Sequence, residues 1–384
     1  MDFELNEEQT MVRNAMRDFA EKEVAPVARD NNRYERFPAD LVKKLGEMGF
    51  LGLNLPSEYE GGGSGYMSYC VMLEELARAD LGLATSVSSH ISLSEKTILQ
   101  WGTEAQKQKY LPRLARGEML GCLATTEPNV GSDISSVETS ATLQGSEWIL
   151  NGNKMWISNG GVAGLAIIIA QTDKSKKGKG LTAFLVERGT PGFSSMDIHN
   201  KLGVRSSNTA ELALEDCHVP QENMLGPLGK GMSVALSAFD SARLGVAART
   251  VGTAQACLDA SISYAQTRKQ FGKLIGSFQL IQEMIADMSV EIEAARLLVY
   301  RAAALKDKGN PATVETSMAK YYSSEIALKA ANNAIQIHGS YGYSDEYPVE
   351  RYFRDVRVST ILEGTSQMHK LIIGRSKTGL SAFV

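Results

Sequence analysis

The sequence predicts an α+β protein that is mainly α-helical, with an N-terminal helical domain, a middle β domain and a C-terminal helical bundle. Apolar residues recur at helical spacing in the first and last thirds of the chain, whereas short β-rich segments separated by Gly, Asn, Asp and Pro fill the region between. Strands and helices do not alternate along the chain, which argues against a Rossmann-type sheet. We therefore expect domains at residues 1–120, 121–228 and 229–384.

The first domain is expected to open with an amphipathic helix from Asn6 to about Ala25. Asn6 followed three residues later by Gln9 has the pattern of a capping box, and Pro26 is expected to end the helix. The Gly-rich segment 55–66 lacks the Lys-Ser/Thr ending of a phosphate-binding loop, so a turn is expected there. Further helical segments are expected over 38–48 and 68–116.

The middle domain is predicted from β-rich segments at hairpin-like distances, which favour a small antiparallel, barrel-like sheet. The basic run from Lys174 to Lys179 lies between two of these segments and is expected at a solvated hairpin tip. The last domain is expected to contain no further strand, and four-helix packing would bury its apolar faces. Its helical segments are expected over 232–264, 278–308, 311–338 and from 348 to the end of the chain.

Composition excludes several classes of function. The net charge of −4 and a pI near 5.9 leave no basic stripe for nucleic acid or an anionic membrane. The four cysteines and five histidines are scattered without metal-ligand spacing, so no metal site is expected. The longest apolar run is too short to span a bilayer, and the N-terminal decapeptide has no leader pattern. We expect a cytoplasmic protein, with a processed mitochondrial matrix form as the open alternative.

Three segments contain residue types that simple packing does not require. The segment 123–133 (LATTEPNVGSD) pairs two hydroxyls with a small Gly-Ser step, through which backbone N–H groups could approach a ligand. The segment 151–161 (NGNKMWISNGG) places Trp156 in a strand, where a core or cross-strand position is the common role. The segment 361–367 (ILEGTSQ) contains Glu363, which could simply be a favourable carboxylate at a helix start.

Together with four further motifs, these segments resemble the acyl-CoA dehydrogenase family, flavoenzymes that oxidise the Cα–Cβ bond of acyl-CoA thioesters. The resemblance covers essentially the whole chain and implies the three-domain architecture already expected from periodicity. It also implies FAD as cofactor, an acyl-CoA substrate, electron-transferring flavoprotein as electron acceptor, and a homotetramer assembled as a dimer of dimers. The further motifs are KLGVRSS at 201–207, TRKQFGK at 267–273, QIHGSYGY at 336–343 and YPVERYFRD at 347–355.

The resemblance assigns Glu363 as the catalytic base, which removes the Cα proton while the β-hydrogen leaves as hydride to flavin N5. Burial beside apolar neighbours would raise the pKa of this carboxylate toward that of a useful base. The backbone N–H of the same residue would help to stabilise the charge that develops on the thioester oxygen. Some family members carry the base immediately before the arginine that corresponds to Arg243, but Ala242 stands there and cannot accept a proton.

The resemblance also implies the ligand contacts. The flavin contacts near the base are Leu123, Thr125, Thr126, Gly131, Ser132, Trp156, Ile157, Ser158, Thr365 and Gln367. The contacts to the flavin of a neighbouring subunit are Arg268, Phe271, Phe278, Gln279, Gln336, Gly339 and Ser340. The substrate contacts are Ser132, Phe239, Asp240, Arg243 and Gly364, and a helix face with an ion pair is the plain alternative for the residues of segment 239–243.

The sequence narrows the choice of acyl group in the substrate but does not fix it. Ala84 stands where glutaryl-CoA enzymes carry an arginine, which disfavours a dicarboxylic substrate. Leu362 replaces the tyrosine that many relatives place before the base, which leaves room for a short, branched or alicyclic acyl group. His90 is a candidate pocket residue or, more simply, a core-edge histidine. An acyl-CoA oxidase and a non-catalytic acyl-CoA-binding relative are the rival functions.

Overall fold

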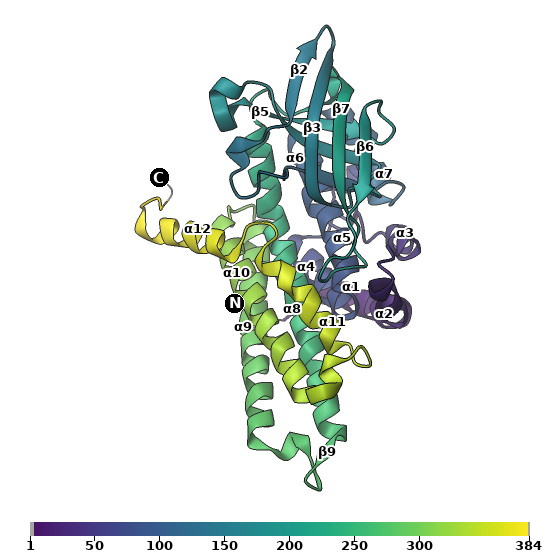
Figure 1. The fold of residues 1–384 in the computed structure, drawn as a ribbon, viewed down its shortest axis with the longest axis vertical. Helices are drawn as coiled ribbons and strands as arrows, with labels where there is room; N and C mark the ends of the chain where they lie inside the picture. Colours follow the sequence, from purple (N-terminus) through teal and green to yellow (C-terminus); the bar gives the residue numbers. More distant parts are fainter. Residues whose placement is uncertain (1–3, 383–384) are drawn as a thin grey trace.

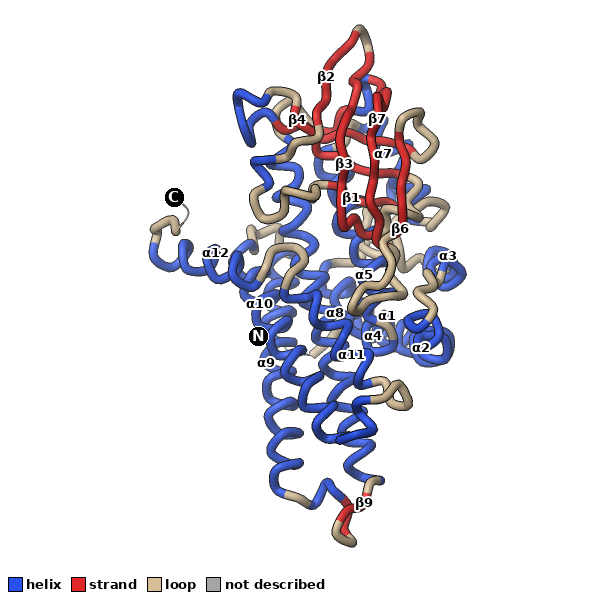
Figure 2. The backbone as a smooth tube through the Cα atoms, viewed as in Figure 1, coloured by secondary structure: helices blue, strands red, loops and turns tan. Residues whose placement is uncertain are grey.

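Helices form both ends of the chain and one large sheet forms its middle, so the predicted fold class is confirmed (Figures 1 and 2). The computed structural model describes residues 4–382. The β domain lies at one end of the elongated molecule, and the long helices of the last third reach the other end (Figure 1). None of the helices within residues 4–382 combines the length and apolarity needed to cross a membrane.

The first third of the chain is a series of short helices. Asn6 and Gln9 form the predicted capping box at the start of the first helix. That helix does not end at Pro26, because a π-helical turn over Ala20–Val24 carries the chain into the next helix. Pro26 lies in the first turn of this second helix, where its missing N–H costs no hydrogen bond. The α-helices are α1 (Glu7–Phe19), α2 (Ala25–Arg33), α3 (Ala39–Glu47), α4 (Tyr66–Ala79), α5 (Leu81–Ser89), α6 (Lys96–Trp101) and α7 (Glu104–Ala115).

The middle of the chain forms an eight-stranded sheet with the order β6-β7-β3-β2-β4-β5-β8, and β1 pairs with β4. Most pairs are antiparallel as predicted, but β4 pairs in parallel with both β1 and β2, which the hairpin spacing did not indicate. The basic run forms the 3-10 turn Lys174–Gly180 between antiparallel β4 and β5, as expected. The strands are β1 (Gly121–Ala124), β2 (Ser140–Gln144), β3 (Glu147–Ser158), β4 (Leu165–Gln171), β5 (Leu181–Glu187), β6 (Phe193–Asp197), β7 (Thr209–Pro220) and β8 (Met224–Leu225).

The central strand β4 explains how the sheet meets the helices. Every residue of β4 is buried, because alternate side chains enter two different cores. Leu165, Ile167 and Ile169 share a core with apolar residues of α7 and the start of α8, and Ala166 and Ile168 share one with β3 and β7. The packing of α8 on the sheet brings the segment 239–243 next to the middle domain.

The last third is dominated by three long helices, α8 (Gly231–Thr267), α9 (Gln279–Asp307) and α10 (Thr313–His338), which pack on one another. The shorter α11 (Val349–Val356) packs against α8 and α10, which completes the predicted four-helix bundle. Two expectations for this region were wrong. The tight turn at 271–272 forms a small hairpin of β9 (Lys269–Gln270) and β10 (Lys273–Leu274), and the final helix is interrupted before α12 (Ser366–Thr378).

Candidate active site

The interruption before α12 is a turn with two successive left-handed residues, Glu363 (φ 54°) and Gly364 (φ 97°). A positive φ is unfavourable for a glutamate, at a cost of about 1–3 kcal/mol that surrounding contacts must offset. Glycine is favoured at position 364 because its φ is positive. It is also favoured because a Cβ atom there would lie 3.1 Å from Nε2 of His369. The chain therefore holds an acidic side chain in a strained turn, which is where functional residues concentrate.

Glu363 is not a helix-start carboxylate. The N-cap of α12 is Thr365, whose side chain accepts a hydrogen bond from the N–H of Met368. Glu363 lies two residues before this cap, and the first turn of α12 contains no acidic residue. Stabilisation of the helix dipole therefore does not account for its position.

Glu363 is half-buried, and positive charges act on its carboxylate. Its Oε2 atom is shielded from solvent and has no hydrogen-bond partner within residues 4–382. Burial raises the pKa of Glu363, and the positive charges of Arg249, Lys320 and Arg243 oppose that rise. Burial also disfavours the charged form of Arg249, and it lowers the pKa of that guanidinium to about 10. The site thus contains a carboxylate with raised proton affinity and an oxygen that is free to take up a proton.

The helix α8 carries three of the five expected substrate contacts, Phe239, Asp240 and Arg243. Arg243 Nη1 donates to Asp240 Oδ1 at 2.6 Å, so the ion pair of the plain alternative is present. This pair does not use the whole guanidinium, because Nε of Arg243 is buried without a partner among the described residues. Phe239 packs against the same core as Leu123, and Ala242 is buried within that core.

The loop after β1 is held by a buried ion pair that the sequence did not indicate. Lys154 is fully buried, and its Nζ donates to Glu127 Oε1 at 2.7 Å and to the Ile169 carbonyl at 2.6 Å. Glu127 also accepts from the backbone N–H and the hydroxyl of Thr139. In the loop so fixed, the Thr125 hydroxyl is buried without a hydrogen-bond partner in the described part of the chain, which leaves it available to a ligand.

Trp156 is not a core residue, contrary to the common role of a strand tryptophan. The register of β3 against β7 shifts between Lys154 and Ile157, which marks a bulge. At this bulge Trp156 has φ 62°, and 60% of its surface is exposed. Bulges next to active sites commonly redirect a side chain, and here the indole is turned outward. The backbone next to it is bonded to the loop after β1, since the N–H of Met155 donates to the Thr126 carbonyl.

The remaining expected flavin contacts near the base differ in accessibility. Ile157 is buried in the β-domain core, so its side chain faces away from solvent, whereas Ser158 is half-buried. Gly131 and Ser132 are exposed, and a Cβ atom added to Gly131 would meet no protein atom within 4 Å. Open space of this kind permits a ligand to approach the backbone closely.

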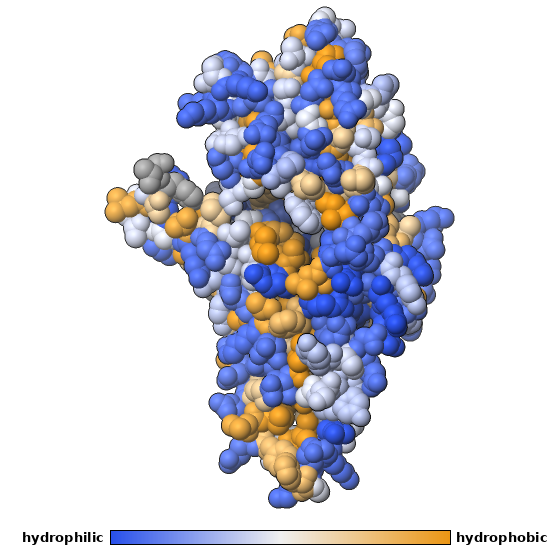
Figure 3. Space-filling view, viewed as in Figure 1, coloured by the Kyte–Doolittle hydropathy of each residue, from blue (hydrophilic) through white to orange (hydrophobic). Residues whose placement is uncertain are grey.

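The second set of expected flavin contacts lies elsewhere. The β9–β10 hairpin that follows Arg268 is at the end of the bundle farthest from the β domain, where Figure 3 shows apolar surface (Figure 1). Phe271 is 93% exposed, its ring packs edge-on against Phe278, and Arg268 lies over Tyr341. One chain therefore does not bring this set to the Glu363 turn. The others at this end are Gln279, at the start of α9, and Gln336, Gly339 and Ser340, around the end of α10.

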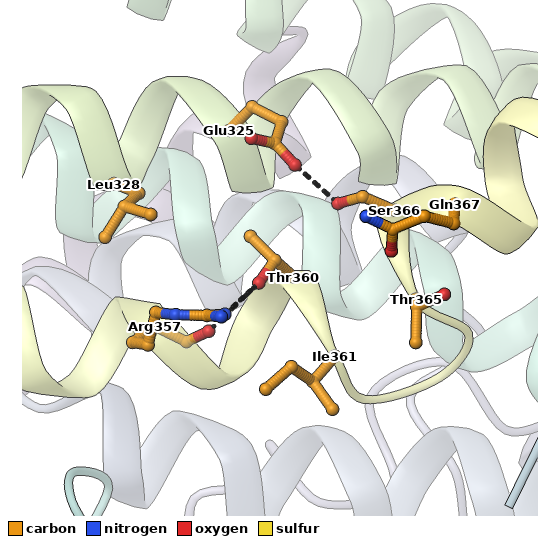
Figure 4. Close-up of a pocket in the computed structure, with 8 residues that line it drawn as sticks. All are labelled: Glu325, Leu328, Arg357, Thr360, Ile361, Thr365, Ser366 and Gln367. Carbon is orange, nitrogen blue, oxygen red and sulfur yellow. Dashed lines mark hydrogen bonds between the residues drawn. The ribbon is translucent and has the colours of Figure 1, made fainter.

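A cavity of about 290 Å³ is lined by residues that precede and follow the Glu363 turn in the chain (Figure 4). Two expected flavin contacts, Thr365 and Gln367, line it, as does Ile361. Figure 4 shows the Ser366 hydroxyl pointing to Glu325 of α10, with a hydrogen bond of 2.6 Å. The other lining residues are Leu328, Arg357 and Thr360.

The expected wall of the acyl pocket, residues 83–94, is buried throughout. His90 is a structural residue, because its Nδ1 accepts from the N–H of Gly121 at 3.0 Å and its Nε2 lies 3.2 Å from the Leu114 carbonyl. These contacts favour the structural alternative for His90, which is fully buried and has Glu95 Oε1 at 3.2 Å from its Nε2. Ala84 is fully buried, and Leu362 is half-buried beside the base.

Comparisons with known proteins show which family this chain is similar to. Family models for the N-terminal, middle and C-terminal domains of acyl-CoA dehydrogenase match residues 6–118, 122–217 and 229–378. A short-chain-specific acyl-CoA dehydrogenase of Clostridium acetobutylicum is 44% identical, over 97% of this chain and 98% of its own. The butyryl-CoA dehydrogenase structure from Megasphaera elsdenii has a TM-score of 0.97 at 42% identity, with coverage of 98% and 100%. Glutaryl-CoA dehydrogenase of Mycobacterium smegmatis in complex with FADH2 has a TM-score of 0.94 at 36% identity, with coverage of 99% and 97%.

Proposed function

This chain belongs to the acyl-CoA dehydrogenase family, which makes it an oxidoreductase, and from that premise we propose that Glu363 is the base in α,β-dehydrogenation of an acyl-CoA thioester. The product is the 2-enoyl-CoA. The observation that carries the proposal is the buried, unpartnered Oε2 of Glu363, which lies in a left-handed turn and interacts with three positive charges. Ala242, at the alternative position for the base, cannot accept a proton.

Proton abstraction requires two properties of the Glu363 carboxylate. The carboxylate must be ionised before substrate binds, which the positive charges of Arg249, Lys320 and Arg243 favour. It must also bind the Cα proton well enough to remove it, which desolvation favours. The backbone N–H of Glu363 is the proposed donor to the thioester oxygen, where charge develops as the proton leaves.

FAD is the cofactor of this chain, and when bound it supplies the acceptor for the hydride from Cβ. The residues present fit it: the Thr125 hydroxyl has no hydrogen-bond partner among residues 4–382, Gly131 faces open space, and the Trp156 indole is exposed. We assign these residues, with Leu123, Thr126, Ser132, Ile157, Ser158, Thr365 and Gln367, to one flavin. Thr125 and Thr126 would orient the ring by hydrogen bonds, and Trp156 would shield it from water.

The set around Arg268 is assigned to the flavin of a neighbouring subunit in a homotetramer. Its distance from the Glu363 turn and the exposure of Phe271 support this assignment. Arg268 would neutralise pyrophosphate charge through charge-assisted hydrogen bonds.

The proposed substrate is a short, branched or alicyclic acyl-CoA. The buried Ala84 offers no charge to a distal carboxylate, and Leu362 is smaller than a tyrosine beside the reacting carbons. We expect butyryl-, isobutyryl-, 2-methylbutyryl- or cyclohexanecarbonyl-CoA to give the highest kcat/KM, by at least about 10-fold over octanoyl-CoA, since a few methylenes change pocket binding by that much. A steady-state screen of these thioesters measures this, and octanoyl-CoA as the best substrate would rule the assignment out.

The proposed electron acceptor is electron-transferring flavoprotein, and the cytoplasm is the proposed location. We expect a yellow protein that loses its flavin colour when acyl-CoA is added without oxygen. Reoxidation of the reduced enzyme should be fast with electron-transferring flavoprotein and slow in air. Stopped-flow absorbance measures both rates, and faster reoxidation by oxygen would instead identify an oxidase.

A further inference from the structure

Three hydrogen bonds join the turn that carries Glu363 to a single helix, α10. Ser324 Oγ donates to the Ser359 carbonyl at 3.0 Å, before the turn. Glu325 accepts from the Ser366 hydroxyl at 2.6 Å, after the turn. Between them, Lys320 Nζ donates to the carbonyl of Gly364 at 2.6 Å. The left-handed conformation of the turn is thus stabilised by contacts on both sides and at its centre.

Lys320 differs from the other two fastening residues because it carries a charge into the interior. The residue is fully buried, although a buried ammonium is costly unless it is paired. A neutral hydroxyl such as that of Ser324 could hold a carbonyl at lower cost. The charge therefore requires a further explanation, and the carboxylate next to Gly364 provides one.

The charged and titratable groups around Glu363 come from four helices, α4, α8, α10 and α12. Arg243 and Arg249 lie on α8, Lys320 on α10 and His369 on α12. Asp240 pairs with Arg243 and offsets its charge. Tyr69 of α4 interacts with Arg249 but is neutral, since burial raises its pKa. His369 is also neutral, because burial lowers its pKa to about 3.

We propose that Lys320 is the positioning residue of the base. Its ammonium fixes the Gly364 carbonyl and thereby aims Glu363, and the same charge favours the ionised form of the carboxylate. The inference rests on the proposed role of Glu363. Arg249 shares the electrostatic part of this task, and Lys320 in addition donates a hydrogen bond to the turn.

The two groups support each other's charge. Burial lowers the pKa of Lys320 to about 7, and the Glu363 carboxylate opposes that shift. Conversely, the Lys320 charge opposes the raised pKa of Glu363. Loss of the ammonium would therefore raise the pKa of Glu363 further, so that a higher pH would be needed to ionise the base.

The test is the pH profile of flavin reduction in Lys320→Met, measured by anaerobic stopped flow with saturating butyryl-CoA. We expect the acid limb to move to higher pH by about one unit, so that the rate on that limb falls about 10-fold. Ser324→Ala is the matched control, because it removes a fastening hydrogen bond from the same helix without removing a charge. Its acid limb should stay where the unchanged protein has it.

Lys320→Gln provides a second variant, since it removes the charge but keeps an amide donor and a similar shape. Its acid limb should move in the same direction as that of Lys320→Met. An unmoved acid limb in the Lys320 variants would overturn the inference, whereas retained flavin reduction in Glu363→Gln would overturn the proposed base itself. The two failures are therefore distinguishable.

Discussion

Replacing Glu363 with glutamine will lower the rate of flavin reduction by acyl-CoA at least about 100-fold, the usual minimum for loss of a general base. Glutamine has nearly the same shape, so the turn and its contacts to α10 should persist. An amide cannot accept the Cα proton, however, so the reaction lacks its first acceptor. Anaerobic stopped-flow absorbance of the flavin, with butyryl-CoA in excess, measures the rate.

The matched control for this variant is Glu291→Gln. Glu291 lies on the outside of α9, where it pairs with Lys329. The same change of carboxylate to amide should therefore leave flavin reduction within about 3-fold, since exposed pairs contribute little. FAD content and butyryl-CoA binding of Glu363→Gln should match those of the unchanged protein. A Glu363→Gln enzyme that still reduces its flavin at the normal rate would mean that another group is the base.

Replacing Lys154 with methionine will destabilise the protein by about 3–5 kcal/mol and release FAD, because it leaves Glu127 as a buried charge without its cationic partner. The loop from Thr125 onward would lose one of its links to the strands, since Lys154 Nζ is also bonded to the Ile169 carbonyl on β4. Thermal unfolding and the flavin-to-protein absorbance ratio measure the two effects.

Lys176→Met is the control for Lys154→Met. Lys176 also pairs with a carboxylate, that of Asp173, but on the surface at the tip between β4 and β5. Its replacement should change the free energy of unfolding by less than about 1 kcal/mol and leave FAD bound. Equal stability and equal FAD content in the two variants would contradict the role assigned to the buried pair.

Much of the fold follows from local patterns in the sequence. The Asn6–Gln9 capping box and the three long helices of the last third lie where spacing predicted them. The errors arise where tertiary contacts override local signals. A π-helical turn carries the chain past Pro26, and β4 pairs in parallel with strands distant in sequence. The domain limits at residues 120 and 228 stay predictions.

The candidate site was only partly readable from the sequence. The motif around Glu363 could be recognised, but its left-handed turn depends on contacts with α10, which lies some forty residues earlier in the chain. Lys154, Arg249 and Lys320 were missed. Each is a lone cation in an otherwise apolar or small-residue stretch, and that signal could have marked them as buried and paired. The bulge that exposes Trp156 arises from a register shift, which periodicity does not reveal.

The most direct test of the account is an anaerobic titration of the FAD-loaded protein with butyryl-CoA. The account predicts that the flavin absorbance bleaches and that crotonyl-CoA, the corresponding 2-enoyl thioester, forms in an amount equal to the flavin reduced. A flavin that stays oxidised with butyryl-CoA and with every other thioester of the screen, in protein that binds them, would contradict it.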